Sequence, residues 1–102
     1  MEVTINKQDT VTTVQFIGRL DTPAAQDFNA KLPELQEAAS GTLVLDCKKL
    51  EYISSSGLRI FLTFRKTAQV KGGKVIVRGI NDDIRNVFLM TGFLNLFEIE
   101  EA

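Results

Sequence analysis

The chain has 102 residues, of which 44% are hydrophobic and 25% are charged, and its formal net charge is -1. This length fits one domain, expected over residues 1–102, and the balanced charge excludes the basic footprint of a nucleic-acid-binding surface. The absence of histidine and the single cysteine, Cys47, exclude a Ser-His-Asp triad, most metal sites and an internal disulfide. No apolar run reaches the ~20 residues that cross a bilayer, so we expect a cytoplasmic protein without membrane insertion, metal or cofactor.

The N-terminal residues predict a β-hairpin. Val3 and Ile5 alternate with polar residues, and the same alternation returns over residues 12–16, after a turn at residues 8–10. Gly18 is expected to break the second strand.

A helix is predicted to follow the hairpin. Thr22 is expected to be its N-cap, with Pro23 at the first helical position. Pro33 lies inside the apolar pattern, so the helix should kink or split near residues 29–32. Residues 40–41, Ser-Gly, end it.

The middle of the chain alternates between strands and a helix. Residues 43–45 are continuously apolar, which is typical of a buried strand; we expect this strand to end at Asp46, before a polar connection. The next helix is predicted over residues 56–70. A turn at residues 71–74 then leads to a second buried strand at residues 75–77.

The C-terminal part adds one more helix. Asn81 is expected to cap it and Gly92 to end it. Residues 94–99 fit a short edge strand, a final helical turn, or both in sequence. The whole order predicts a single α/β domain: a mixed, mostly parallel sheet with an N-terminal hairpin, covered by helices.

Three consecutive serines, Ser54, Ser55 and Ser56, precede Gly57 at the start of the central helix. Serine is a preferred N-cap, so Ser54 or Ser55 can simply cap the helix, with Gly57 allowing close packing. Alternatively, the helix N-terminus favours negative charge, and a phosphate on one of these serines would be stabilised there. Arg59 lies four residues after Ser55 on the same polar side, where it could pair with that phosphate.

The central helix also has a wide apolar face. That face comprises Leu58, Ile60, Phe61, Leu62, Phe64 and Ala68. Ile60 and Phe64 lie at its edge, where they could either reach a partner or be buried under the neighbouring helix.

Residues 46–57, Asp-Cys-Lys-Lys-Leu-Glu-Tyr-Ile-Ser-Ser-Ser-Gly, resemble the signature of STAS-domain anti-sigma factor antagonists. Residues 18–21, Gly-Arg-Leu-Asp, and residues 79–97 resemble other parts of that family, so the resemblance covers nearly the whole chain. It implies a STAS-like fold and a regulatory protein without catalysis. It also implies two partners: an anti-sigma factor with serine-kinase activity, and a phosphatase that reverses the phosphorylation.

Carried to this chain, the resemblance implies that Ser55 is the phosphoacceptor, with Ser54 and Ser56 as neighbouring alternatives. We expect a monomer or weak dimer. The expected partner-binding residues are Asp21, Ser54, Ser55, Ser56, Gly57, Arg59, Ile60 and Thr63.

Other interpretations stay open. A STAS-type domain can be a subunit or scaffold of a transporter or sensory complex without phosphorylation. Asp46 at a strand end is similar to a response-regulator phosphoacceptor, but no acidic pair follows the first strand. Asp21 could simply start the following helix. A nucleotide-binding domain is disfavoured because the sequence has no phosphate-binding loop.

Overall fold

The computed structural model describes residues 1–101; Ala102, the last residue of the expected domain, lies outside the described residues. Five strands form one sheet in the order β1-β2-β3-β4-β5. They are β1 (Glu2–Gln8), β2 (Val11–Leu20), β3 (Thr42–Ile53), β4 (Lys74–Arg78) and β5 (Glu98–Glu100). β1 pairs antiparallel with β2 and the other neighbours pair in parallel, so the predicted mixed, mostly parallel sheet is confirmed.

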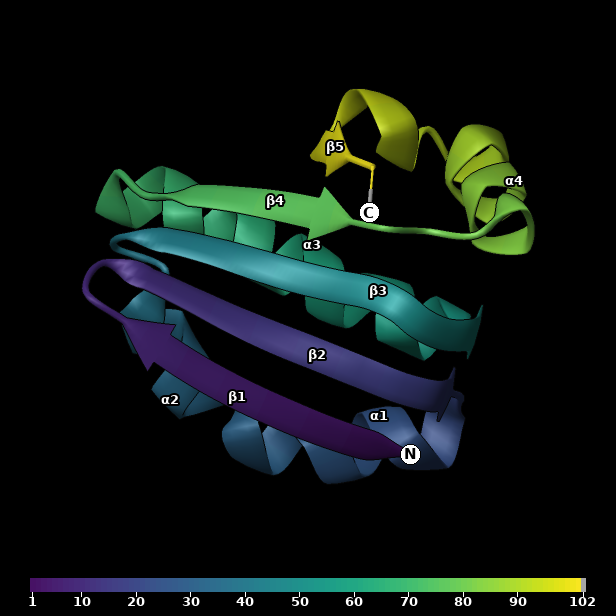
Figure 1. The fold of residues 1–102 in the computed structure, drawn as a ribbon, viewed down its shortest axis with the longest axis horizontal. Helices are drawn as coiled ribbons and strands as arrows, with labels where there is room; N and C mark the ends of the chain where they lie inside the picture. The colour runs from purple at the N-terminus through teal and green to yellow at the C-terminus, as the bar shows by residue number, and fades with distance from the viewer. Residues whose placement is uncertain (102) are drawn as a thin grey trace.

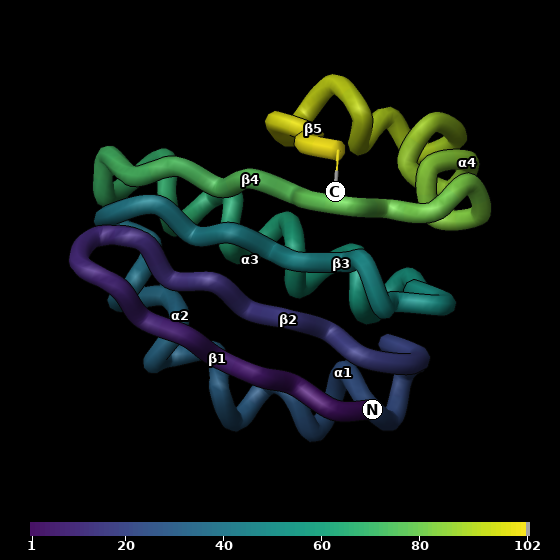
Figure 2. The backbone as a smooth tube through the Cα atoms, in the orientation of Figure 1, coloured from purple at the N-terminus to yellow at the C-terminus, as the bar shows by residue number. Residues whose placement is uncertain are grey.

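The helices lie mainly on one face of this sheet. They are α1 (Thr22–Phe28), η1 (Asn29–Lys31), α2 (Leu32–Ala38), α3 (Ser55–Lys71), α4 (Asp82–Thr91) and η2 (Phe93–Asn95). Figures 1 and 2 show α1, α2 and α3 behind the sheet, while the face toward the viewer carries no helix of the described chain. The predicted split before Pro33 is confirmed, and the C-terminal segment forms both a helical turn and a strand.

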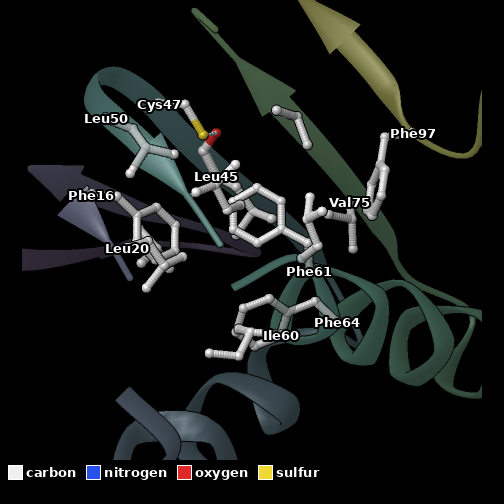
Figure 3. Close-up of a cluster of buried hydrophobic side chains, with 14 of the residues drawn as sticks. Phe16, Leu20, Leu45, Cys47, Leu50, Ile60, Phe61, Phe64, Val75 and Phe97 are labelled. Atoms are coloured by element: carbon white, nitrogen blue, oxygen red, sulfur yellow. Dashed lines mark hydrogen bonds between the residues drawn. The ribbon is translucent and has the colours of Figure 1, made fainter. Parts of the chain in front are cut away.

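The core fills the space between the sheet and α3. Val14 and Phe16 alternate with polar residues on β2 and are fully buried on the helix side. Phe61 projects from α3 into this core (Figure 3), with its ring 5.5 Å from that of Phe16 and 6.3 Å from that of Phe88 on α4. Each such side chain contributes about 1.5–3 kcal/mol on burial, which holds α3 firmly against the strands.

Two expectations about strand ends are wrong. Gly18 does not end β2: it takes a φ of +102°, which suits glycine, at a register shift, and the strand continues to Leu20. Asp46 does not end β3 either. The strand continues through the expected polar connection to Ile53, because its pairing with β2 resumes after each register shift.

The helix boundaries also differ slightly from the prediction. The N-cap of α1 is Asp21 rather than Thr22, because the longer side chain accepts the Ala24 N–H at 3.0 Å. α3 begins one residue earlier and ends one residue later than expected, at Lys71, and its C-cap is Gly72 with a φ of +76°. The cap of α4 by Asn81 is confirmed by its bond from the Ile84 N–H at 2.8 Å.

Candidate functional site

Two helices begin side by side at the carboxyl edge of the sheet. β2 and β3 run toward the same side, on the right in Figure 1, and Leu20 pairs with Ile53 at their ends. α1 and α3 follow directly after these strands. The Ser54 N–H donates to the Leu20 carbonyl at 2.9 Å, which ties the start of α3 to the end of β2. Asp21 directly follows β2 and Ser54 directly follows β3, so the two residues lie at the same edge of the sheet.

Ser54 serves as the N-cap of α3. Its Oγ accepts the Gly57 N–H at 3.2 Å, and the residue is only 9% exposed. This bond satisfies one of the N–H groups that the first helical turn leaves unpaired. Asp21 does the same for α1, so both residues have a structural role at the site.

Ser55, in contrast, is exposed at the first position of α3. Within residues 1–101 its hydroxyl forms no hydrogen bond, and the first turn of α3 contains no acidic residue. The N-terminal end of this 17-residue helix therefore presents a free hydroxyl in a field that favours negative charge. Ser56 is half-buried and lines a groove next to α1.

Gly57 is required by close packing rather than by its backbone angles. A Cβ at this position would lie 2.8 Å from Leu20 Cγ and 2.9 Å from Ile53 Cγ1. The absence of a side chain lets the first turn of α3 approach the ends of β2 and β3. Gly57 is buried, so its place in the expected partner surface is indirect.

A groove of about 200 Å³ separates α1 from α3. It is lined by Ala25, Gln26, Asn29, Leu32, Ser56, Arg59, Ile60 and Thr63. Arg59 is exposed, and no carboxylate of residues 1–101 forms a salt bridge with it. The Thr63 hydroxyl donates to the Arg59 carbonyl at 3.0 Å. The groove therefore combines polar and apolar side chains with one cation that has no carboxylate partner among residues 1–101.

Ile60 does not extend to the surface as the partner-binding expectation required. It is 4% exposed, and Phe64 is fully buried. Both side chains pack in the core beneath α1 (Figure 3), which is the second of the two alternatives drawn from the sequence. Ile60 therefore lines the groove but offers a partner little exposed surface.

Asp46 has a structural environment that differs from a phosphoacceptor site. It lies within β3, is 6% exposed, accepts the Lys48 N–H at 3.1 Å and lies 3.6 Å from the Lys48 Nζ. Its neighbour Cys47 is fully buried in the core (Figure 3), and burial, together with the Asp46 charge, raises the pKa of its thiol. In residues 1–101 no three acidic or cysteine side chains are grouped to hold a metal ion.

One feature at this edge was not predicted from the sequence. The Arg19 guanidinium lies over the Tyr52 ring, 4.4 Å from its centroid, on strands that bring the two residues into register. Each residue comes two positions before a helix cap, Asp21 or Ser54. That equal spacing is the signal in the sequence that could have indicated the pair.

Comparison with known proteins gives a consistent result. A family model described as STAS domain matches residues 2–102. BtrV of Bordetella bronchiseptica is 29% identical over 102 residues, which cover all of this chain and 88% of BtrV. The Staphylococcus aureus anti-sigma-B factor antagonist is 21% identical over 102 residues, covering all of this chain and 94% of the relative.

The fold also matches solved structures. The anti-sigma factor antagonist SpoIIAA in its unphosphorylated form has a TM-score of 0.77 and 19% identity, covering 99% of this chain and 89% of that one. Its phosphorylated form from Bacillus has a TM-score of 0.77 and 20% identity, covering 99% and 91%. Among the described residues, no helix is both long and apolar enough to cross a bilayer.

Proposed function

The chain belongs to the STAS-domain family, and from this premise we propose that it is an anti-sigma factor antagonist. In this role the unphosphorylated chain binds an anti-sigma factor and so releases the sigma factor. The proposal is supported by the full-length similarity to the S. aureus anti-sigma-B factor antagonist. The observation that carries it is the exposed Ser55 at the N-terminus of α3.

Ser55 is the proposed phosphoacceptor. Of the three serines, Ser54 is 9% exposed and its Oγ is engaged with the Gly57 N–H, and Ser56 is half-buried in the groove. Only Ser55 offers an exposed hydroxyl to a kinase. The partners are an anti-sigma factor with serine-kinase activity and a phosphatase that removes the phosphate.

Phosphate on Ser55 would act through charge rather than through refolding. It adds about -1.5 to -2 charges at neutral pH, beside the positive end of α3 and one turn from Arg59. These groups stabilise the modified chain when it is free. Burying the same charge in a protein interface without matched cations costs several kcal/mol, and ~4.1 kcal/mol already weakens binding a thousandfold.

The surface that meets the partner consists of the exposed and half-exposed groups at this edge. They are Asp21, Ser55, Ser56, Arg59 and Thr63. Ser54 and Gly57 support this surface from below, by capping α3 and by letting its first turn approach the strands.

The test uses the serine-kinase anti-sigma factors of the source organism, expressed singly and titrated with the chain by calorimetry. We expect one of them to bind the wild-type chain and to transfer one phosphate to it from ATP, mapped to Ser55 by mass spectrometry. Ser55→Asp should weaken binding at least about a hundredfold, with an unchanged far-ultraviolet CD spectrum.

Ser54→Ala is the matched control, because it removes an adjacent hydroxyl that is buried. This variant should still accept one phosphate at Ser55. Phosphate mapped to another residue, or equal affinity of the wild-type chain and Ser55→Asp, would contradict the switch. Failure of every anti-sigma factor to bind would contradict the antagonist function itself.

A further inference from the structure

The face of the sheet opposite the helices carries an exposed pair, Arg19 and Tyr52. Leu20 and Ile53 are buried on the helix side, and side chains alternate along a strand, so Arg19 and Tyr52 point to the open face. Tyr52 is 41% exposed, although large aromatic side chains contribute most to stability or binding when they are buried. Arg19 lies on β2 and Tyr52 on β3, each two residues before the N-cap of the helix that follows its strand.

Two irregularities of the backbone place this pair. Register shifts between β2 and β3 occur between Gln15 and Ile17 and between Gly18 and Arg19. The second shift brings Arg19 opposite Tyr52, and Gly18 permits it with a φ of +102°. Such bulges redirect side chains near sites of interaction.

A shallow hollow of about 530 Å³ lies beside Arg19. It is lined by Met1, Glu2, Ile17, Gly18, Arg19 and Asp21. A Cβ on Gly18 would meet only Met1 Cα at 3.9 Å, so the glycine leaves the hollow open where another residue would fill it. Asp21 both lines the hollow and caps α1, so the hollow reaches the edge of the sheet at which α1 begins.

We propose that the Arg19–Tyr52 pair is a second contact for the anti-sigma factor, which places a carboxylate side chain on the Arg19 guanidinium. The proposal rests on the proposed function. No residue in the range 1–101 accepts a hydrogen bond from this guanidinium or forms a salt bridge with it. The ring holds the guanidinium in place, which leaves its N–H groups oriented for a carboxylate at low entropic cost.

The occupant follows from position and charge. Ser55 directly follows the ends of β2 and β3, where Arg19 and Tyr52 lie two residues before the caps, so a partner on Ser55 has both residues close by. Arginine and tyrosine are the residue types that most often dominate binding energy in protein interfaces. This contact does not involve the phosphoacceptor, so it would set partner choice in the unmodified chain.

The test titrates the full chain against the anti-sigma factor identified above. Arg19→Ala and Tyr52→Ala should each lower affinity by about tenfold or more, and Arg19→Glu by more than Arg19→Ala. Arg19→Lys should not restore full affinity, because an ammonium neither stacks nor donates in a planar fork. Lys74→Ala is the matched control: it removes an exposed cation from the amino end of β4, and its affinity should equal that of the wild-type chain.

Three results would overturn the inference. The first is wild-type affinity for the Arg19 and Tyr52 variants while the wild-type chain binds, which leaves the proposed function standing. The second is a change in self-association of the Arg19 variants by light scattering without a change in partner affinity, which would assign the pair to a second copy. The third is failure of the wild-type chain to bind any anti-sigma factor, which overturns the function as well. Thermal unfolding of each variant checks that lost affinity does not come from lost folding.

Discussion

The Ser54 N–H donates to the Leu20 carbonyl at 2.9 Å, so the first residue before α3 is bonded to the last residue of β2. This bond continues the β2–β3 ladder into the start of the helix. Ser55 follows immediately, and its position is therefore set by the backbone of its neighbours and not by its own side chain. The fold makes no use of the Ser55 hydroxyl, so a change to that side chain should leave these bonds intact.

The first prediction separates the roles of the two adjacent serines in stability. Ser54→Ala removes the acceptor of the Gly57 N–H and should lower the free energy of unfolding by about 1 kcal/mol. Ser55→Ala removes an exposed hydroxyl and should change it by less than about 0.5 kcal/mol. Urea unfolding followed by CD measures both. An equal loss for the two variants would show that the cap is assigned to the wrong serine.

Asp21 allows its capping role to be separated from its charge. Asparagine keeps the side-chain oxygen that accepts the Ala24 N–H, so Asp21→Asn should stay within about 0.5 kcal/mol of the wild-type stability. Asp21→Ala should lose about 1 kcal/mol. If Asp21 meets the partner through its charge, Asp21→Asn should bind several-fold more weakly although it remains equally stable. Unchanged affinity would limit Asp21 to its capping role.

Gly57 offers a test of how tightly α3 packs on the strands. Alanine favours a helix over glycine by up to about 1 kcal/mol, yet a Cβ here would press on Leu20 and Ile53. We expect the steric cost to be larger, with a net loss of about 1 kcal/mol. In a Leu20→Ala background the contact with Leu20 is removed while that with Ile53 stays, so Gly57→Ala should then cost clearly less than in the wild-type chain. Additive effects in this double-mutant cycle, measured by urea unfolding, would exclude the contact.

The sequence was sufficient for the elements whose local chemistry is strong. Pro33, Asn81 and Gly92 act within one or two residues of themselves, through a missing N–H, a side-chain cap and a left-handed backbone angle. The split of the first helix and both ends of α4 were predicted for that reason. The placement of Ser55 on the exposed side of α3 followed equally from helical periodicity.

The predictions that failed depend on pairing between distant residues. The polar stretch after Asp46 predicts a loop from sequence alone, but it continues β3 because β2 pairs with it as far as Ile53. Gly18 predicts the end of the second strand, but in the structure it lies at a register shift inside β2. The Arg19–Tyr52 contact depends on that shift, and the burial of Ile60 depends on how closely α1 approaches α3. The equal spacing of Arg19 and Tyr52 before their helix caps hints at their contact, and burial of Ile60 was one of two alternatives, but neither follows from the pattern of one segment alone.

Cys47 leads to a prediction about the pH dependence of stability. Burial raises the pKa of its thiol, and the Asp46 charge raises it further, whereas the thiol of the unfolded chain has a pKa of about 8.5. Above that pH the unfolded chain loses the proton and the folded chain keeps it. The unfolded state then binds fewer protons, so stability falls as pH rises, by up to about 1.4 kcal/mol per pH unit.

The matched variant is Cys47→Ala, which removes the thiol from the core but adds no titrating group. It should be less stable than the wild-type chain near neutral pH, because it leaves a small cavity at a fully buried position. From about pH 7 to pH 10 the wild-type chain should lose about 2 kcal/mol relative to the variant, which narrows or reverses the difference. Guanidinium unfolding at several pH values measures this difference. Other groups that titrate in the same range contribute equally to both chains, so their contribution drops out of the comparison. A constant difference across the range would mean that the folded thiol ionises as readily as the unfolded one, and that Cys47 is accessible to water.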